Sequence, residues 1–184
     1  LIPEYLRFVK GLVDSADLPL NVSREVIQQD RLVSVIRKHL TNKVLGYLKD
    51  LLEKDRPRYE TLWAEFGPAL KEGFHYDPSM RDKLADLVLV ASTHGPGLFT
   101  LKEVAARAKE GQKALYYLTG ENREILAQAP QLEVFRKRGV EVMLLGDPVD
   151  EIMVATLDKF DDKPLKSAAR GELDGLPEAE GEEK

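Results

Sequence analysis

The sequence predicts an α/β protein in which a coil of about three helices precedes a small α-β-α lobe with a short parallel sheet. Between residues 23 and 88, apolar residues recur at three- and four-residue steps, which is the pattern of amphipathic helices. From residue 98 onward, helical stretches alternate with short apolar runs. This order is typical of parallel strands joined by right-handed helical crossovers.

The composition excludes several classes of protein. The chain has 184 residues, of which 43% are hydrophobic, so it can bury a substantial core, and no apolar run is long enough to span a membrane. It has no cysteine, which excludes disulfides and thiolate metal sites and fits a reducing compartment such as the cytoplasm.

The net charge of −5 is concentrated in residues 171–184, where six acidic residues accompany one lysine. The remaining residues are electrically balanced, so nothing in the charge pattern calls for a nucleic acid or an anionic membrane as partner. Residues 171–184 are also poor in apolar side chains, and we expect them to form an acidic linker or tail.

The first predicted element is a strand over residues 5–14, which are rich in Phe, Val and Leu and bounded by turn residues. A single strand is not stable alone, so this prediction implies further sequence upstream.

Residues 23–94 are predicted to form the helical coil. Ser23 is a good N-cap for the first helix. Trp63 lies on an apolar stripe of the second helix, where a core position is favoured over a ligand-stacking role. Pro68 should kink or interrupt that helix. The predicted helices cover residues 23–54, a stretch from Pro57, and a stretch from about Asp77-Pro78.

A change in composition after Gly95-Pro96-Gly97 marks the predicted boundary of the small lobe, residues 98–170. Thr100 and Glu103 have the spacing of a capping box, which predicts a helix that ends near Gly111. Apolar runs predict strands at 114–119, 140–145 and 163–168, with helical stretches after Asn122 and after Asp147-Pro148.

No complete active site is visible in the sequence. His39, His75 and His94 are isolated, without the spacing of metal ligands or a partnered nucleophile. Gly120-Glu121-Asn122 follows a predicted strand but lacks the further glycines or the Gly-Lys-Ser/Thr of a phosphate loop. A plain strand-to-helix turn is therefore favoured.

Three acidic residues, Asp147, Asp150 and Glu151, stand together at the start of a predicted helix. A magnesium cluster is one interpretation. An N-cap and first-turn carboxylates that oppose the helix dipole explain them more simply, so no metal site is predicted.

The loop before the first predicted helix carries an arginine in an unusual position. Pro19 stiffens the loop and Ser23 caps the helix, so Arg24 falls at the first helical position, where the helix dipole disfavours a cation by about 0.3–1 kcal/mol. Gln28 lies four residues later on the same helix face. The arrangement is suited to presenting a guanidinium to an anion. Pairing with a nearby carboxylate is the alternative, and spacing alone favours it.

The same stretch carries a family resemblance. Residues 14–25, Asp-Ser-Ala-Asp-Leu-Pro-Leu-Asn-Val-Ser-Arg-Glu, together with Gln28-Gln29, closely resemble the middle domain of the heat-shock protein 90 chaperones, and the bacterial branch most of all. The resemblance runs in one register from Leu1 to about Ala168. Its other segments are Leu1 to Gly11, Ala91 to His94, Lys109 to Lys113, Tyr116-Tyr117, Asp147-Pro148 and Asp150-Glu151.

The resemblance implies a part of an ATPase. By its position Arg24 matches the family's catalytic-loop arginine, which reaches the γ-phosphate of ATP, and Gln28 matches a neighbouring residue of that loop. The resemblance implies that ATP and Mg²⁺ are bound mainly by a separate N-terminal domain of the same protein. It also implies that residues 1–22 are the truncated end of a preceding α/β lobe, namely its final strand and catalytic loop. This chain alone is then expected to bind no nucleotide and to be inactive.

The resemblance also implies binding of unfolded client proteins, possible co-chaperones, and dimerisation through a C-terminal domain, in a cytoplasmic stress-response protein. In the family, the helix after the Asp-Pro turn takes part in client binding, which assigns Glu151, Ile152 and Ala155 to the contact surface. Ile152 stands where the family commonly has an aromatic residue. Ordinary packing of this helix against the sheet is the alternative.

Two other functions compete with the chaperone interpretation. A free-standing nucleotide-binding α/β protein would bind ATP with this chain alone, and the missing phosphate loop argues against it. A non-catalytic protein-interaction adaptor would bind its partner regardless of nucleotide and of Arg24. Residue patterns alone favour the adaptor, whereas the resemblance favours the chaperone.

Overall fold

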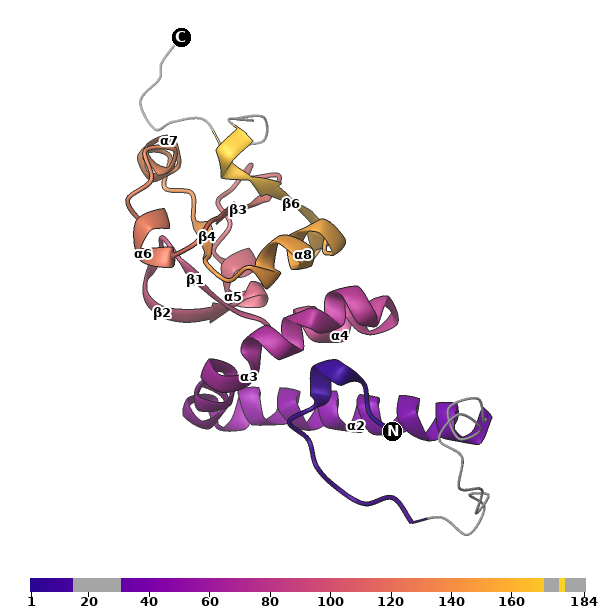
Figure 1. Ribbon diagram of the computed structural model, residues 1–184. Coiled ribbons are helices and arrows are strands. Elements are labelled where there is room, and N and C mark those ends of the chain that lie inside the picture. The colour runs from indigo at the N-terminus through magenta and orange to yellow at the C-terminus, as the bar shows by residue number, and fades with distance from the viewer. Residues whose placement is uncertain (15–30, 171–175, 178–184) are drawn as a thin grey trace. The chain divides into compact units, whose positions relative to one another are not determined.

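A computed structural model describes residues 1–14, 31–170 and 176–177 of the chain (Figure 1). The chain divides into two compact units, Leu1–Leu70 and Lys71–Lys184. The division falls within helix α3, Arg56–Tyr76. Among the described helices, none combines the length and the apolar character that crossing a bilayer requires.

The first unit is built from helix α2, Arg31–Lys54, the first part of α3, and the N-terminal segment. Apolar residues of both helices and of a short 3-10 helix, Glu4–Leu6, form its core. The ring of Phe8 stacks on that of Phe66, with centroids 4.6 Å apart. The buried apolar residues of this unit are Tyr5, Leu6, Val33, Leu45, Leu48, Leu52, Tyr59, Trp63, Ala69 and Leu70.

The strand predicted over residues 5–14 is wrong in this structure. The segment begins with the 3-10 helix Glu4–Leu6, in which Pro3 and Glu4 accept backbone hydrogen bonds from Leu6 and Arg7, and residues 9–14 have no regular secondary structure. The described part of the first unit contains no strand. A strand needs a neighbour to satisfy its backbone groups, so the β-prone residues take a local turn instead.

Helix α3 continues through Pro68 to Tyr76, so of the two predicted effects of this proline the interruption is wrong, and the kink stays a prediction. Gly67 permits a close approach inside this helix, because a Cβ at this position would lie 2.8 Å from Cε2 of Trp63. The indole ring therefore covers the backbone of the next turn.

The second unit contains a six-stranded sheet with the strand order β2-β1-β4-β3-β6-β5. Strand β3 is central and pairs in parallel with β4 and with β6, whereas β1–β2, β1–β4 and β5–β6 are antiparallel. The strands are β1, Leu89–Ser92; β2, Gly95–Thr100; β3, Leu115–Thr119; β4, Val142–Leu145; β5, Lys159–Phe160; and β6, Lys163–Ser167.

The prediction of a short parallel sheet is correct for β3, β4 and β6 and incomplete for the rest. Residues 89–94 are predicted as part of the helical coil and Gly95-Pro96-Gly97 as a lobe boundary, but these segments form the antiparallel pair β1 and β2. Proline is tolerated in β2 because that strand lies at the edge of the sheet, where one side of its backbone needs no partner.

Seven α-helices, α2 to α8, occur in the described residues. The capping box is confirmed: Thr100 Oγ1 accepts from the Glu103 amide, and the Glu103 carboxylate accepts from the Thr100 amide. Asn122 caps the next helix. The helices of the second unit beyond α3 are α4, Arg81–Ala85; α5, Leu101–Ala106; α6, Arg123–Leu126; α7, Leu132–Lys137; and α8, Val149–Thr156.

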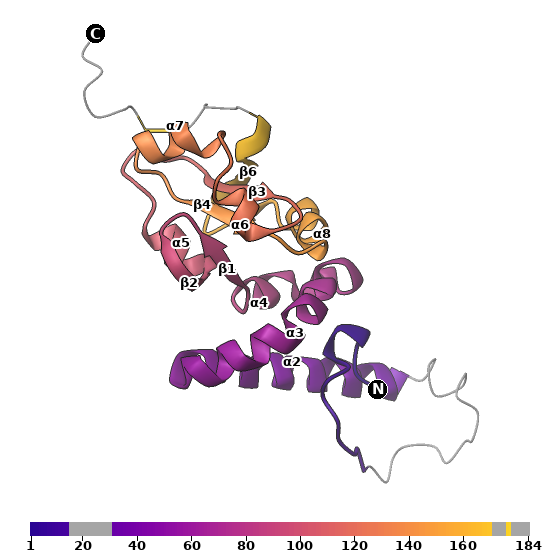
Figure 2. The same cartoon turned by 60° about the vertical axis from the view of Figure 1, so that its left-hand side comes forward.

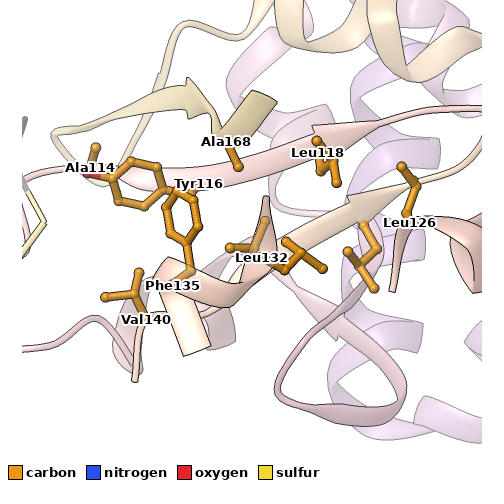
Figure 3. Close-up of a cluster of buried hydrophobic side chains, with 10 residues drawn as sticks. Ala114, Tyr116, Leu118, Leu126, Leu132, Phe135, Val140 and Ala168 are labelled. Atoms are coloured by element: carbon orange, nitrogen blue, oxygen red, sulfur yellow. The ribbon is translucent and has the colours of Figure 1, made fainter. Parts of the chain in front are cut away.

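Helices α6 and α7 cover one face of the sheet and α8 lies on the other (Figures 1 and 2). The strand order explains this, because right-handed crossovers from β3 to β4 and from β4 to β6 proceed in opposite directions across the sheet. On the α6–α7 side, Tyr116 packs against Phe135 with ring centroids 5.0 Å apart (Figure 3). This cluster of buried side chains is Ala114, Tyr116, Leu118, Leu126, Leu132, Phe135, Val140, Val142, Leu144 and Ala168.

Candidate functional site

The two predicted catalytic residues, Arg24 and Gln28, lie outside the described residues, as does the loop that carries them. The structure therefore describes only one of the two predicted sites, the helix α8 that follows the Asp147-Pro148 turn (Figure 1).

Helix α8 is amphipathic, and the predicted contact residues are exposed to solvent. Glu151, Ile152 and Ala155 are exposed, and Ile152 retains 44% of its accessible surface. They lie on one helix face, since Ala155 is four residues after Glu151. Met153 and Leu157 are buried and hold the opposite face of this segment against the protein. The exposed face is therefore available for contact, and packing against the sheet is done by other residues.

The start of α8 is fixed by a buried ionic cluster that composition and spacing did not reveal. Lys71 Nζ lies 2.6 Å from Oδ1 of Asp150 and donates a hydrogen bond of 2.8 Å to Oδ2 of Asp147. Lys71 is 4% exposed and Asp150 is 1% exposed, whereas about half of the Asp147 side chain is accessible. Oδ1 of Asp150 is thus paired with the Lys71 ammonium group.

Neither Asp147 nor Asp150 caps the first-turn amides of the helix with its side chain; Asp150 instead supports the turn that precedes the helix. Oδ2 of Asp150 accepts the backbone N–H of Asp147 at 2.9 Å, while the Asp147 carboxylate turns to Lys71. The interpretation of these acids as first-turn residues is right for Asp150 and Glu151, which lie in the first turn, at the positive end of the helix dipole. The expectation that Asp147 supplies the cap through its side chain is wrong, because the lysine competes for that carboxylate.

Burial raises the pKa of Asp150 above the ordinary value of an aspartate. Removal from water disfavours the charged form, and this is the largest contribution. Lys71 and the Asp147 amide partly offset it by stabilising the carboxylate. The cluster therefore holds a carboxylate whose ionisation is costly, and its integrity depends on the lysine.

The end of α8 is held by a second cation. Arg81 Nη1 donates to the backbone oxygen of Thr156 at 3.3 Å and lies 3.8 Å from the carboxylate of Asp158. The Arg81 side chain is 38% exposed. A cation at the C-terminus of a helix complements its dipole, but partly exposed contacts of this length contribute little.

Residues of the Ala91 to His94 motif form a polar cluster with a structural role. The Glu141 carboxylate accepts from Ser92 Oγ at 2.6 Å and from Arg107 at two positions, each 2.8 Å. The Arg107 guanidinium lies 4.5 Å from the ring centroid of Phe99, and the His94 ring meets the edge of the same phenyl group. The motif thus ties β1 and β2 to the segment before β4.

The Lys109 to Lys113 motif also has a structural role, which is to fix the backbone of its loop. Gln112 is buried; its side chain accepts from the Lys109 amide at 3.0 Å and donates to the Ala114 oxygen at 2.7 Å. Gly111 has φ of +79°, which side chains disfavour. The motif therefore shapes the loop that leads into β3.

The turn after β3 has the hydrogen bonds of a strand-to-helix connection: the Gly120 amide donates to the Leu145 oxygen at 3.2 Å, and the Asn122 side chain accepts from the amides of Glu124 and Ile125. A Cβ at Gly120 would lie 2.8 Å from Cδ2 of Leu126, so the space beside this glycine is filled by an apolar side chain. Across the described ranges, no group of three or more His, Cys, Asp or Glu residues is placed to hold a metal ion.

A family profile described as "Hsp90 protein" matches residues 1–184, the whole of the sequence. The chain belongs to the Hsp90 family. Among curated Hsp90 relatives it is 50% identical over 187 residues to "Chaperone protein HtpG" of Magnetococcus marinus, covering 100% of this chain and 29% of that protein. It is 53% identical over 174 residues to the protein of the same name from Bdellovibrio bacteriovorus, covering 95% and 28%.

A third Hsp90 relative, "Chaperone protein HtpG" of Geobacter sulfurreducens, is 48% identical over 186 residues, which covers 100% of this chain and 28% of that protein. The chain thus spans less than a third of the length of the relatives it matches.

Lys71, in the ionic cluster at the start of α8, is the residue that the sequence patterns did not single out. A signal was present, because Lys71 lies between the buried residues Leu70 and Phe74, four positions after Gly67, on the stripe that also carries Trp63. A lysine on the apolar face of a helix requires a buried partner. Its partners are about 76 positions further along the chain, which no local pattern reveals.

Proposed function

We propose that this chain is the middle portion of an ATP-dependent molecular chaperone, which binds unfolded or partly folded polypeptides and contributes an arginine to ATP hydrolysis. The observation that carries the proposal is the family match over all 184 residues, together with about 50% identity to proteins named "Chaperone protein HtpG". Because the chain spans 29% of such a relative, the remaining parts of the activity are assigned to segments outside it.

In this proposal, ATP and Mg²⁺ bind mainly to a separate N-terminal domain, and a C-terminal domain supplies dimerisation in the cytoplasm. The turn at Gly120 supports a nucleotide site outside this chain, because the amides of Gly120, Glu124 and Ile125 donate within the protein and a phosphate needs open backbone amides. The chain itself would bind no nucleotide tightly. That property separates the proposal from a free-standing nucleotide-binding protein.

Arg24 is proposed to act as an arginine finger toward the γ-phosphate, with Gln28 beside it in the same loop. A guanidinium delivered from a separate element stabilises charge on the transferring phosphoryl group, an effect worth about 10³–10⁵ in rate in GTPases. Arginine suits this role because its planar group donates paired hydrogen bonds and keeps its charge.

ATP hydrolysis by three samples tests this assignment: the 184-residue chain, the intact protein, and the intact protein with Arg24→Ala. We expect no turnover by the chain alone and at least about a tenfold loss in the variant, which corresponds to about 1.4 kcal/mol in the barrier. Arg31→Ala, at the exposed start of α2, is the matched control and should retain activity. Equal rates for Arg24→Ala and the unmodified protein would remove Arg24 from the mechanism.

The exposed face of α8, Glu151, Ile152 and Ala155, is proposed to contact client polypeptides. Its support is the exposure of an apolar side chain beside a charged one on a helix whose other face is buried. Isoleucine offers less contact area than an aromatic residue would, so this face should contribute a modest share of the binding free energy.

Binding of a permanently unfolded model protein tests the α8 face. Ile152→Asp should weaken binding about tenfold, because it places a charge where an apolar contact forms. Ile125→Asp is the matched control, since Ile125 on α6 is 69% exposed and lies outside the proposed face. If the two variants bind equally well, the α8 face is not the contact surface.

A further inference from the structure

Helix α8 is held at both ends by cations that follow the first unit in sequence: Lys71 at its start and Arg81 at its end. We propose that Lys71 is the positioning residue of the client-binding face, fixing the rotation of α8 and thereby its affinity for polypeptides. This inference rests on the function proposed for that face. Lys71 does not itself contact a client, since it is 4% exposed.

The helix cannot hold its orientation unaided. It has eight residues, and isolated helices of that length are unstable in water because nucleation is costly. Two buried apolar side chains, Met153 and Leu157, attach its middle and end. Such contacts are non-directional, so they stabilise the helix against the protein without fixing its rotation closely.

The ionic cluster supplies directional contacts that fix the rotation of α8. One ammonium group meets carboxylates from two positions of the α8 segment, at 2.6 Å for Asp150 and 2.8 Å for Asp147. Asp150 also accepts the Asp147 amide, so the turn and the first helical residues move as one body. In buried surroundings these charge interactions are strong, and losing one partner leaves an uncompensated charge.

The exposed face is tied directly to this cluster. Glu151 and Ile152 are the two residues after Asp150, and Ala155 lies about one turn beyond Glu151. A helix advances by about 100° per residue, so a small change in rotation at Asp150 turns Ile152 toward or away from solvent. Release of Lys71 would therefore alter the presentation of the face before it unfolds the sheet.

Arg81 provides an internal comparison. It binds the other end of the same helix, but its side chain is 38% exposed and its contacts are 3.3 Å and 3.8 Å long. Exposed ion pairs contribute little to stability, whereas buried pairs are costly to break. The two cations should therefore differ sharply in effect although both contact α8.

The test compares Lys71→Met with Arg81→Met in the 184-residue chain, with two measurements for each. Hydrogen exchange should rise about tenfold or more in the α8 amides of Lys71→Met and remain unchanged in β3 and β4, and affinity for the unfolded model protein should fall at least about fivefold. Arg81→Met should change either quantity less than about twofold. Unchanged α8 exchange in Lys71→Met would overturn the proposal.

A double variant separates positioning from overall stability. Lys71→Met with Asp150→Asn removes the unpaired buried carboxylate and should restore much of the melting temperature. If Lys71 positions α8, rapid α8 exchange and weak binding persist in the folded double variant. Recovery of binding together with the melting temperature would show a purely stabilising lysine and overturn the proposal.

The Ile152→Asp variant separates the proposed client face from the positioning role of Lys71. If it binds the model protein normally, the proposed client face fails, and the effect of Lys71 on binding fails with it. The α8 exchange of Lys71→Met is measured without a client. It therefore tests whether Lys71 positions α8 independently of whether α8 binds a client.

Discussion

Arg107 holds both carboxylate oxygens of Glu141, through Nε and Nη2, at 2.8 Å each. The Glu141 side chain is 9% exposed and also accepts from Ser92, so one carboxylate satisfies donors from two other elements. Paired, charge-assisted hydrogen bonds of this kind are stronger than neutral ones. They also raise the pKa of Arg107, which keeps its charge at every accessible pH.

Glu141→Gln should therefore lower the free energy of unfolding by about 1–3 kcal/mol, because it leaves the buried hydroxyl of Ser92 and the partly buried guanidinium of Arg107 poorly matched. Denaturant titration measures the change. Glu124→Gln is the control, since its pair with Arg123 is 3.3 Å long and both side chains are more than half exposed. That control should stay within about 0.5 kcal/mol of the parent. Equal losses of unfolding free energy in both variants would show that Glu141 contributes no more to stability than an exposed ion pair does.

The raised pKa of Asp150 predicts a pH dependence with a definite sign. Because the folded state holds this proton more tightly than the unfolded chain, the contribution of Asp150 to stability falls as pH rises above about 3.9, the ordinary aspartate value. The unfolding free energy of the parent minus that of Asp150→Asn should accordingly decrease between pH 4 and pH 7. A difference that grows over this range would mean that Lys71 outweighs burial.

Gly146 follows β4 at a point where two backbones nearly touch. A Cβ there would lie 2.9 Å from the amide nitrogen of Arg123, at the start of α6. Backbone cannot move aside cheaply, so Gly146→Ala should cost about 1–3 kcal/mol of stability. Gly46→Ala, inside α2 with no atom within 4 Å, should instead stabilise by about 0.5–1 kcal/mol. Thermal unfolding of the two variants checks the opposite signs.

Asp161 and Asp162 both have positive φ, at 50° and 63°, in the two-residue turn between β5 and β6. Such a turn favours Asn-Gly, because an L side chain in this conformation costs up to about 1–2 kcal/mol. Asp161→Asn with Asp162→Gly should therefore raise the melting temperature.

A control for this turn removes the same two charges and keeps Cβ at both positions. Asp161→Ala with Asp162→Ala should lower the melting temperature, since alanine tolerates positive φ less well than aspartate. If both double variants stabilise equally, relief of charge repulsion, and not backbone conformation, governs this turn.

Local patterns predicted the local elements well. The Thr100–Glu103 spacing gave the helix start correctly, and the apolar runs located β3, β4 and β6 to within a few residues. These features depend on near neighbours in sequence, through caps and side-chain alternation. They are therefore encoded where they occur.

Pairing across the chain could not be predicted. Residues 5–14 have strand-like composition without a described strand beside them, whereas β1 pairs with its neighbour β2 and also with the distant β4. The cluster at α8 likewise depends on Lys71, which is remote in sequence from its carboxylates. The exposure of Ile152 agrees with the predicted contact face, but client binding by it and the role of Arg24 stay predictions.

The strand order has a consequence for synthesis of the protein. Strand β1 pairs with β4, and beside this pair Thr93 bonds Val142, 49 residues later, while β3 also needs β6. At about 5–20 residues per second, the nascent β1–β2 hairpin waits several seconds on the ribosome with an unpaired edge. Unpaired apolar edges recruit other chains. A polypeptide proposed to protect unfolded proteins thus passes, during its own translation, through a stage that needs such protection.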